Sequence, residues 1–130
     1  MLKRIPYQAK GFTILELLVV LIIIGILAAL GLPNFVKTKE STLDKEAKSN
    51  LELISAAEKS YHMDYDSYFI SADLAAINSN LKLSLHAANW NYKIVSDANF
   101  TAKAQRVNDS SNVWCISRDT DDPYKTNCSW

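Results

Sequence analysis

A single carboxylate stands at the start of the longest apolar run in the sequence. Glu16 is followed by the 20 residues from Leu17 to Val36, and none of these is charged. A carboxylate placed in lipid or in a dry helix bundle costs several kcal/mol unless a cation pairs with it, so such an acid is treated as a functional residue. The chemistry that Glu16 offers is ion pairing, and the sequence must supply its cation.

Three acids close together near the end of the chain form a second candidate site. Asp119, Asp121 and Asp122 lie just before Pro123. Clustered carboxylate oxygens favour calcium, although the pattern lacks the glycine and the distal glutamate of an EF-hand. A solvated acidic turn is the alternative. No other cofactor is indicated.

Charge and residue content argue against nucleic-acid binding by charge neutralisation and against catalysis. The 130 residues carry 14 basic and 14 acidic side chains, so the net charge is zero, which argues against a protein that binds nucleic acid by neutralising phosphates. No direct nucleic-acid motif is present either. The two histidines, His62 and His86, are isolated from each other and from cysteine or serine patterns, so no catalytic residue is predicted and we expect no enzyme.

The residues around Glu16 have the layout of a membrane or export segment. Met1–Lys10 carries three cations and no acid, and Leu17–Val36 would be about 30 Å long as a helix, which matches the hydrocarbon core of a bilayer. The apolar side chains contribute about −4 to −7 kcal/mol to insertion, which outweighs one acid at about +3 kcal/mol. A secretory signal cleaved near Gly31 and a plain transmembrane anchor are the alternatives, and neither explains Glu16.

The same region also carries a likeness to a known family. It rests on Lys10-Gly11-Phe12-Thr13-Ile14-Leu15-Glu16 and on the Gly25, Gly31 and Pro33 that interrupt the apolar run. Together these residues resemble the class III signal and N-terminal helix of type IV pilins and of the related pseudopilins of type II secretion. The only departure from the family's usual pattern is an exchange of two neighbouring aliphatic residues.

This resemblance implies a processing step and a partner for the carboxylate. A prepilin peptidase would cut after Gly11 and methylate the new amino terminus on Phe12, so that Glu16 becomes the fifth residue of the mature chain. The Phe12 amine is then the missing cation. Because a helix does not easily bring its first residue back onto its fifth side chain, we expect the pair to join neighbouring chains and to set their register.

The resemblance further implies a structural subunit of a type IV pilus-like filament that serves motility, adhesion or DNA uptake. Its partners would be further copies, other pilins, the prepilin peptidase, an inner-membrane assembly platform, and membrane lipid before assembly. The chain would cross the inner membrane once before assembly and then enter an extracellular pilus or a periplasmic pseudopilus. The alternatives are a pseudopilin of a type II secretion system and a single-pass anchored binding domain that never polymerises.

One long helix is predicted from Phe12 to about His62. Its second half has an apolar stripe at intervals of three or four residues, and Gly25, Gly31 and Pro33 are expected to kink its first half. The stripe consists of Leu43, Ala47, Leu51, Ile54, Ala57 and Tyr61. The predicted organisation is a leader over 1–11, an apolar helix half over 12–35, an amphipathic half over 36–62 and a head over 63–130.

The head is predicted to be a small antiparallel meander. Ser71 or Asp73 could cap a short helix through Ile77, and three runs read as strands separated by polar turns. These runs are Trp90–Val95, Phe100–Val107 and Val113–Ser117. Since one sheet face needs cover, the fold class is α+β, with a long protruding N-terminal helix packed on the sheet, as in the ladle of pilins.

Cys115 and Cys128 are the only cysteines in the sequence. If the front of the chain works as the resemblance implies, both lie outside the cytoplasm, where an even number of cysteines favours a disulfide. Two free thiols are the alternative, and a metal site would lack ligands. In the family, a C-terminal disulfide loop is more a pilin feature than a pseudopilin one.

Overall fold

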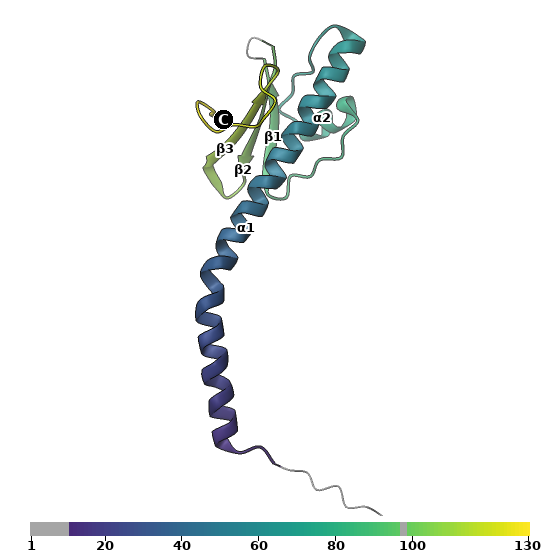
Figure 1. The fold of residues 1–130 in the computed structure, drawn as a ribbon. Helices are drawn as coiled ribbons and strands as arrows, with labels where there is room; N and C mark the ends of the chain where they lie inside the picture. The colour runs from purple at the N-terminus through teal and green to yellow at the C-terminus, as the bar shows by residue number, and fades with distance from the viewer. Residues whose placement is uncertain (1–10, 97–98) are drawn as a thin grey trace, which may run out of the picture. The chain divides into compact units, whose positions relative to one another are not determined.

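The computed structural model describes residues 11–96 and 99–130, without the side chains of residues 31–33. The predicted leader, apart from Gly11, and the middle of the turn at 96–99 therefore lie outside the described residues. The chain divides into two compact units, Met1–Lys39 and Glu40–Trp130. Figure 1 shows the element order α1, α2, β1, β2, β3.

The long predicted helix is present as α1 (Ile14–Tyr65). It ends three residues later than predicted, where Asp66 takes the left-handed conformation with a φ of 52° and its N–H donates to the carbonyl of His62 at 2.9 Å. This closes the last turn. The backbone of α1 is helical throughout, so no break interrupts it near Gly25 or Pro33, and the kink stays a prediction.

The short helix α2 (Leu74–Leu81) begins where the sequence predicted. Asp73 is its N-cap, because its carboxylate accepts from the N–H groups of Ala75 and Ala76. The prediction that it ends at Ile77 is wrong by four residues. The Asn78 side chain bonds the backbone of Leu85 twice at 2.9 Å, which ties the following loop to the helix and makes a longer α2 favourable.

The sheet has the predicted antiparallel order, β1–β2–β3, with β1 (Trp90–Val95), β2 (Thr101–Arg106) and β3 (Asp109–Ser117). The prediction that β3 starts at Val113 is wrong, because the polar stretch before it pairs with the end of β2. Backbone pairing does not require apolar side chains at an exposed hairpin tip. The hairpin turn is therefore shorter than the sequence suggested, with a register shift between Gln105 and Arg106.

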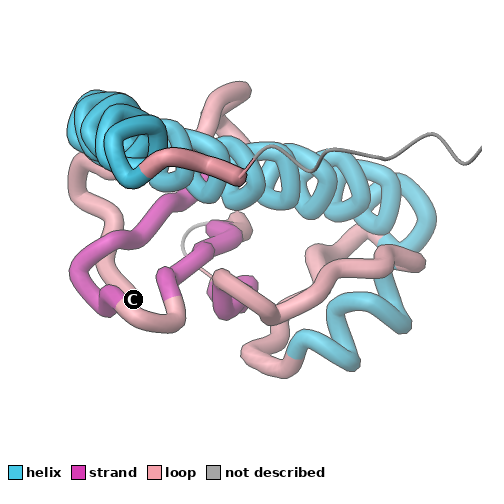
Figure 2. The backbone as a smooth tube through the Cα atoms, turned by 90° about the horizontal axis from the view of Figure 1, so that it is seen from below, coloured by secondary structure: helices cyan, strands magenta, loops and turns pink. Residues whose placement is uncertain are grey.

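One face of the sheet packs against the part of α1 that belongs to the second unit, as Figure 2 shows. Leu51 and Ile54 of the predicted stripe are fully buried there, and Tyr61 packs against their cluster. Leu43 contributes its backbone instead, since its carbonyl accepts from the Trp90 indole at 3.0 Å. The α+β prediction, with the sheet packed on the helix, is confirmed. The central buried side chains of the cluster are those of Ala47, Leu51, Ile54, Ile77, Trp90, Ile94, Phe100, Ala102, Ala104 and Ile116.

The chain's last residues cover part of the opposite sheet face. Lys93, Lys103 and Cys115 stand opposite one another across the three strands. Cys115 is bonded to Cys128, the Lys103 ammonium donates to the carbonyl of Ser129 at 2.8 Å, and the Lys93 ammonium lies 4.2 Å from the ring centre of Trp130. A disulfide, a hydrogen bond and a cation–π contact therefore hold the C-terminal residues on this face of the sheet.

Candidate functional site

The first turn of α1 is closed by a reciprocal pair of side chains. Thr13 is the N-cap residue, and its hydroxyl accepts from the backbone N–H of Glu16 at 3.2 Å. In return the Glu16 carboxylate accepts from the N–H and the hydroxyl of Thr13, both at 3.2 Å. This is a capping box, which satisfies backbone donors that the first turn of a helix otherwise leaves free. It also places a negative charge at the positive end of the helix dipole.

The capping box shows where the Glu16 carboxylate lies relative to the helix start. It contacts Thr13, the residue next to Phe12, and the expectation that the Phe12 amine does not easily fold back onto Glu16 of its own chain stays a prediction. The chain's own first turn is therefore within reach of this carboxylate. Thr13 was missed as a site residue, although the spacing of a threonine three residues before a glutamate could have indicated it.

The surface around this first turn is apolar and unburied. Phe12 is 83% exposed, Ile14 87% and Leu17 59%, and the aliphatic side chains that follow are exposed as well. By length and composition, α1 is one helix that could cross a membrane. An apolar surface of this extent needs lipid or other protein chains to cover it.

Gly11 precedes this turn in an irregular, exposed segment. A Cβ added to Gly11 would meet nothing within 4 Å, and the same holds for Gly25 inside α1. The described part of the chain therefore gives neither position a steric reason to be glycine.

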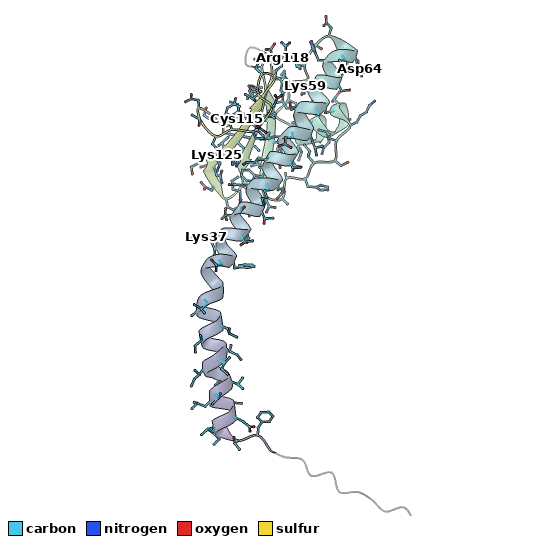
Figure 3. All side chains as sticks on the ribbon, in the orientation of Figure 1. Lys37, Lys59, Asp64, Cys115, Arg118 and Lys125 are labelled. Atoms are coloured by element: carbon cyan, nitrogen blue, oxygen red, sulfur yellow. A yellow bond between two sulfur atoms is a disulfide. The ribbon has the colours of Figure 1, made fainter. Side chains whose placement is uncertain are left out.

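The C-terminal loop is the second functional candidate, and it is oxidised as predicted. Cys115, buried in β3, is bonded to Cys128 with 5.8 Å between the Cα atoms. Figure 3 labels Cys115 on the sheet and Lys125 beside it. The backbone of Cys115 also exchanges two hydrogen bonds with Tyr124, at 2.8 and 2.9 Å, so the loop returns along the edge of β3.

A polar cluster fastens this loop to α1. The Asp44 carboxylate accepts from the Trp114 indole at 3.3 Å and lies 3.6 Å from the Lys125 ammonium. The ammonium groups of Lys48 and Lys125 lie 4.3 and 4.5 Å from the ring centre of Trp114. Cation–π contacts and an ion pair thus join the helix, the sheet and the loop around one tryptophan.

The acidic residues of the loop do not come together. Asp119, Asp121 and Asp122 are exposed, and Asp121 lies 3.9 Å from the ammonium of Lys59. Within residues 11–96 and 99–130, no three His, Cys, Asp or Glu side chains lie in an arrangement that could hold a metal ion. Calcium at these three residues stays an untested prediction.

The structure also contains a buried carboxylate that the sequence analysis did not single out. Glu58 is fully buried under the loop that follows α1, and one of its oxygens accepts from the N–H of Phe69 at 2.9 Å. Burial raises the pKa of Glu58 from 4.5 to about 7, and the Phe69 N–H acts in the opposite direction. Because many other acids on α1 are exposed, the sequence gives no sign that Glu58 is buried.

These features define a class of protein. An apolar helix start whose one carboxylate belongs to a capping box, together with a separate unit that has its own core and disulfide, is the layout of a membrane-anchored subunit with a folded head.

Comparison with known proteins narrows this class. Residues 7–32 match the family model of the prokaryotic N-terminal methylation motif. The chain is 33% identical over 120 residues to the type IV wide pilus major component PilA4 of Thermus thermophilus, an alignment that covers 92% of this chain and 89% of the relative. The chain belongs to the family of type IV pilins and pseudopilins.

Two further relatives match over shorter lengths. Type IV major pilin protein PilA of Myxococcus xanthus is 46% identical over 65 residues, which is 50% of this chain and 30% of the relative. Type II secretion system core protein G of Pectobacterium carotovorum is 37% identical over 62 residues, which is 48% of this chain and 40% of the relative. The family membership and the apolar N-terminal helix together identify a membrane-anchored precursor of a filament subunit.

Proposed function

We propose that this chain is a structural subunit of a type IV pilus-like filament, with no catalytic role of its own. A prepilin peptidase removes residues 1–11 and methylates the amine of Phe12, and the mature chain polymerises through α1. The observation that carries the proposal is the exposed apolar start of α1 with Glu16 held in its first turn. The full-length likeness to a wide-pilus component supports the same role.

The processing step follows from the chemistry of the first turn. Before cleavage, Gly11 and Phe12 are joined by an ordinary amide without charge, and among the described residues the Glu16 carboxylate bonds the polar groups of Thr13. Cleavage creates a cation on Phe12, four residues before Glu16 and next to Thr13. Because the structure itself leaves space at Gly11 for a side chain, the glycine there suits an enzyme that must approach the backbone closely.

Assembly then replaces lipid by protein around α1. The chain is stored in the inner membrane, extracted by an assembly platform and stacked with further copies and other pilins. One helix that offers different faces to different neighbours makes the non-closing contacts that a fibre needs. Inside the bundle, pairing of Glu16 with the amine of a neighbouring Phe12 avoids two isolated buried charges and fixes the register.

A pseudopilin of a type II secretion system is the second candidate, because a core protein G relative is 37% identical over 62 residues, which is 48% of this chain. The disulfide between Cys115 and Cys128 favours the pilus. The two differ in location: an extracellular pilus in one case and a periplasmic pseudopilus in the other. Sheared cell-surface fibres in which this chain is the major component support the pilus, and their absence from secreting cells supports the pseudopilin.

The assembly role is tested with Glu16→Gln in the native host. We expect leader cleavage to persist and fibre yield to fall at least tenfold, since leaving one member of a buried ion pair unpaired costs about 3–5 kcal/mol. Immunoblots of sheared fibres measure the yield, and mass spectrometry of the membrane fraction measures cleavage. Glu52→Gln, at an exposed position of the same helix, is the control and should give normal fibres. Normal fibre yield from the Glu16 variant would remove the proposed pairing.

A further inference from the structure

Glu58 is a buried acid whose hydrogen bonding is incomplete. One carboxylate oxygen, Oε2, accepts from the N–H of Phe69, but the other, Oε1, is buried and finds no hydrogen-bond partner among the described residues. A buried polar atom without a partner costs about 1–3 kcal/mol, and more if it is charged. Such a pair of oxygens suits a protonated carboxyl better than an anion.

His62 lies one helical turn after Glu58 and has a ring nitrogen that could accept a hydrogen bond from a protonated Glu58. Its Nδ1 is buried and also lacks a partner in the part of the chain that the structure describes. Residues four apart lie on the same face of a helix with their Cβ atoms about 5–6 Å apart, so the two side chains can reach each other by rotation. The His62 ring stacks on Tyr68 at 4.4 Å between ring centres.

Both side chains lie beneath one short piece of chain, residues 66–71, which we name the latch segment. Its Tyr68 covers His62, and its Phe69 packs 5.9 Å from the ring centre of Tyr61. At its end, Ser71 exchanges two backbone hydrogen bonds with Ile94, at 2.7 and 3.1 Å, on the outer edge of β1. The latch segment therefore joins the end of α1 to the edge of the sheet.

We propose that Glu58 and His62 share one proton and that this proton holds the latch segment on α1 and β1. With the proton on Glu58 Oε1, the hydroxyl donates to His62 Nδ1, and one hydrogen bond satisfies both orphaned atoms. Oε2 remains free to accept from Phe69. When the proton leaves, a buried anion remains beneath the latch segment with a single backbone donor, and the segment detaches more readily.

Among the residues that the structure describes, the latch segment contacts this pair through uncharged groups, and its one charged residue, Asp66, is exposed. These groups are the Phe69 N–H and the phenol of Tyr68, which packs 4.9 Å from Phe100 beside β2. On α1 itself, Tyr61 is half-buried, and the two nearest charged residues, Lys59 and Asp64, are exposed. Figure 3 labels Lys59 and Asp64 at this end of the helix.

The raised pKa of Glu58 gives the direction of the pH effect. An acid with a folded-state pKa of about 7 and an ordinary value of 4.5 contributes stability that is fully present below 4.5 and is lost as pH rises through 7. The latch segment should therefore be held more tightly in mildly acidic than in neutral or alkaline medium. This inference does not depend on whether the chain forms a pilus.

Amide hydrogen exchange of the full-length chain in detergent micelles tests the latch. After correction for the intrinsic pH dependence of exchange, protection of the Phe69, Ser71 and Ile94 amides should fall about 100-fold between pH 5 and pH 8. Glu58→Gln should give high protection at both pH values, because a neutral amide can accept from Phe69 and donate to His62. Glu52→Gln, at an exposed site, should keep the wild-type pH dependence.

A histidine variant separates proton sharing from simple packing. His62→Phe keeps a ring to stack on Tyr68 but has no Nδ1, so protection should be low at pH 5 and pH 8 alike. Wild-type protection that is the same at both pH values would overturn the latch. So would an unchanged pH dependence in either the Glu58→Gln or the His62→Phe chain.

Discussion

At the scale of single residues, two glutamates on one helix show opposite ways of placing an acid. Glu16 lies exposed at the helix start, where its carboxylate accepts from the N–H and the hydroxyl of Thr13. Glu58 lies in the folded core, where burial favours its neutral form. The first is available for a partner outside the chain, and the second acts on the chain's own loop.

The capping box is tested by Thr13→Val, which keeps the shape of the side chain but removes its hydroxyl. We expect the first turn of α1 to lose about 1 kcal/mol of stability, because N-cap replacements typically cost about 0.5–2 kcal/mol. Hydrogen exchange at the Leu17 amide, which donates to the Thr13 carbonyl, measures the loss. Thr13→Ser should behave like the wild type. Equal exchange in the valine and serine variants would show that the hydroxyl does not hold the turn.

At the scale of elements, the sequence predicts what periodicity and special residues determine. The apolar stripe around Leu51 and Ile54 predicted that α1 packs on the sheet. Aspartate is a residue that favours helix N-caps, so Asp73 predicted the start of α2. The start of β3 was missed because its pairing rests on backbone hydrogen bonds between polar residues. Burial of Glu58 was missed because the cover comes from the latch segment, a contact between elements that a single sequence does not encode locally.

The residues of the candidate site could be predicted from the sequence where their type or surroundings are unusual, but their contacts could not. Glu16 stands out by its apolar surroundings, whereas its contact with Thr13 depends on side-chain geometry at the helix start. The disulfide was predictable because the chain has only two cysteines. Its attachment to α1 through Asp44 and Trp114 was not, since those residues lie 70 positions apart in sequence.

The disulfide loop gives a prediction at this scale. Replacing Cys115 and Cys128 together by serine should lower the free energy of unfolding by about 3 kcal/mol, because a loop of this length is restricted in the unfolded chain by about that amount. Denaturant unfolding of the detergent-solubilised chain, followed by tryptophan fluorescence, measures the difference. The wild type under reducing conditions is the matched comparison. A double variant as stable as the oxidised wild type would mean that the cation–π and polar contacts alone fasten the loop.

At the scale of the whole molecule, the two units have different requirements. The second unit, Glu40–Trp130, buries its own core and closes its own disulfide. The first unit, Met1–Lys39, exposes a long apolar surface and must be covered by lipid or by other chains. Transfer of that surface from membrane to filament is the event that the proposed function describes, and in that proposal cleavage after Gly11 is the step that permits it.

The most direct test of the account is the amino terminus of the mature protein. Intact-mass and peptide mass spectrometry of the chain purified from its native membrane and filament fractions should give a first residue of Phe12 with one methyl group on its amine. A chain that still begins at Met1, or one that begins near Leu32, would contradict the account, because no cation would then stand next to Glu16.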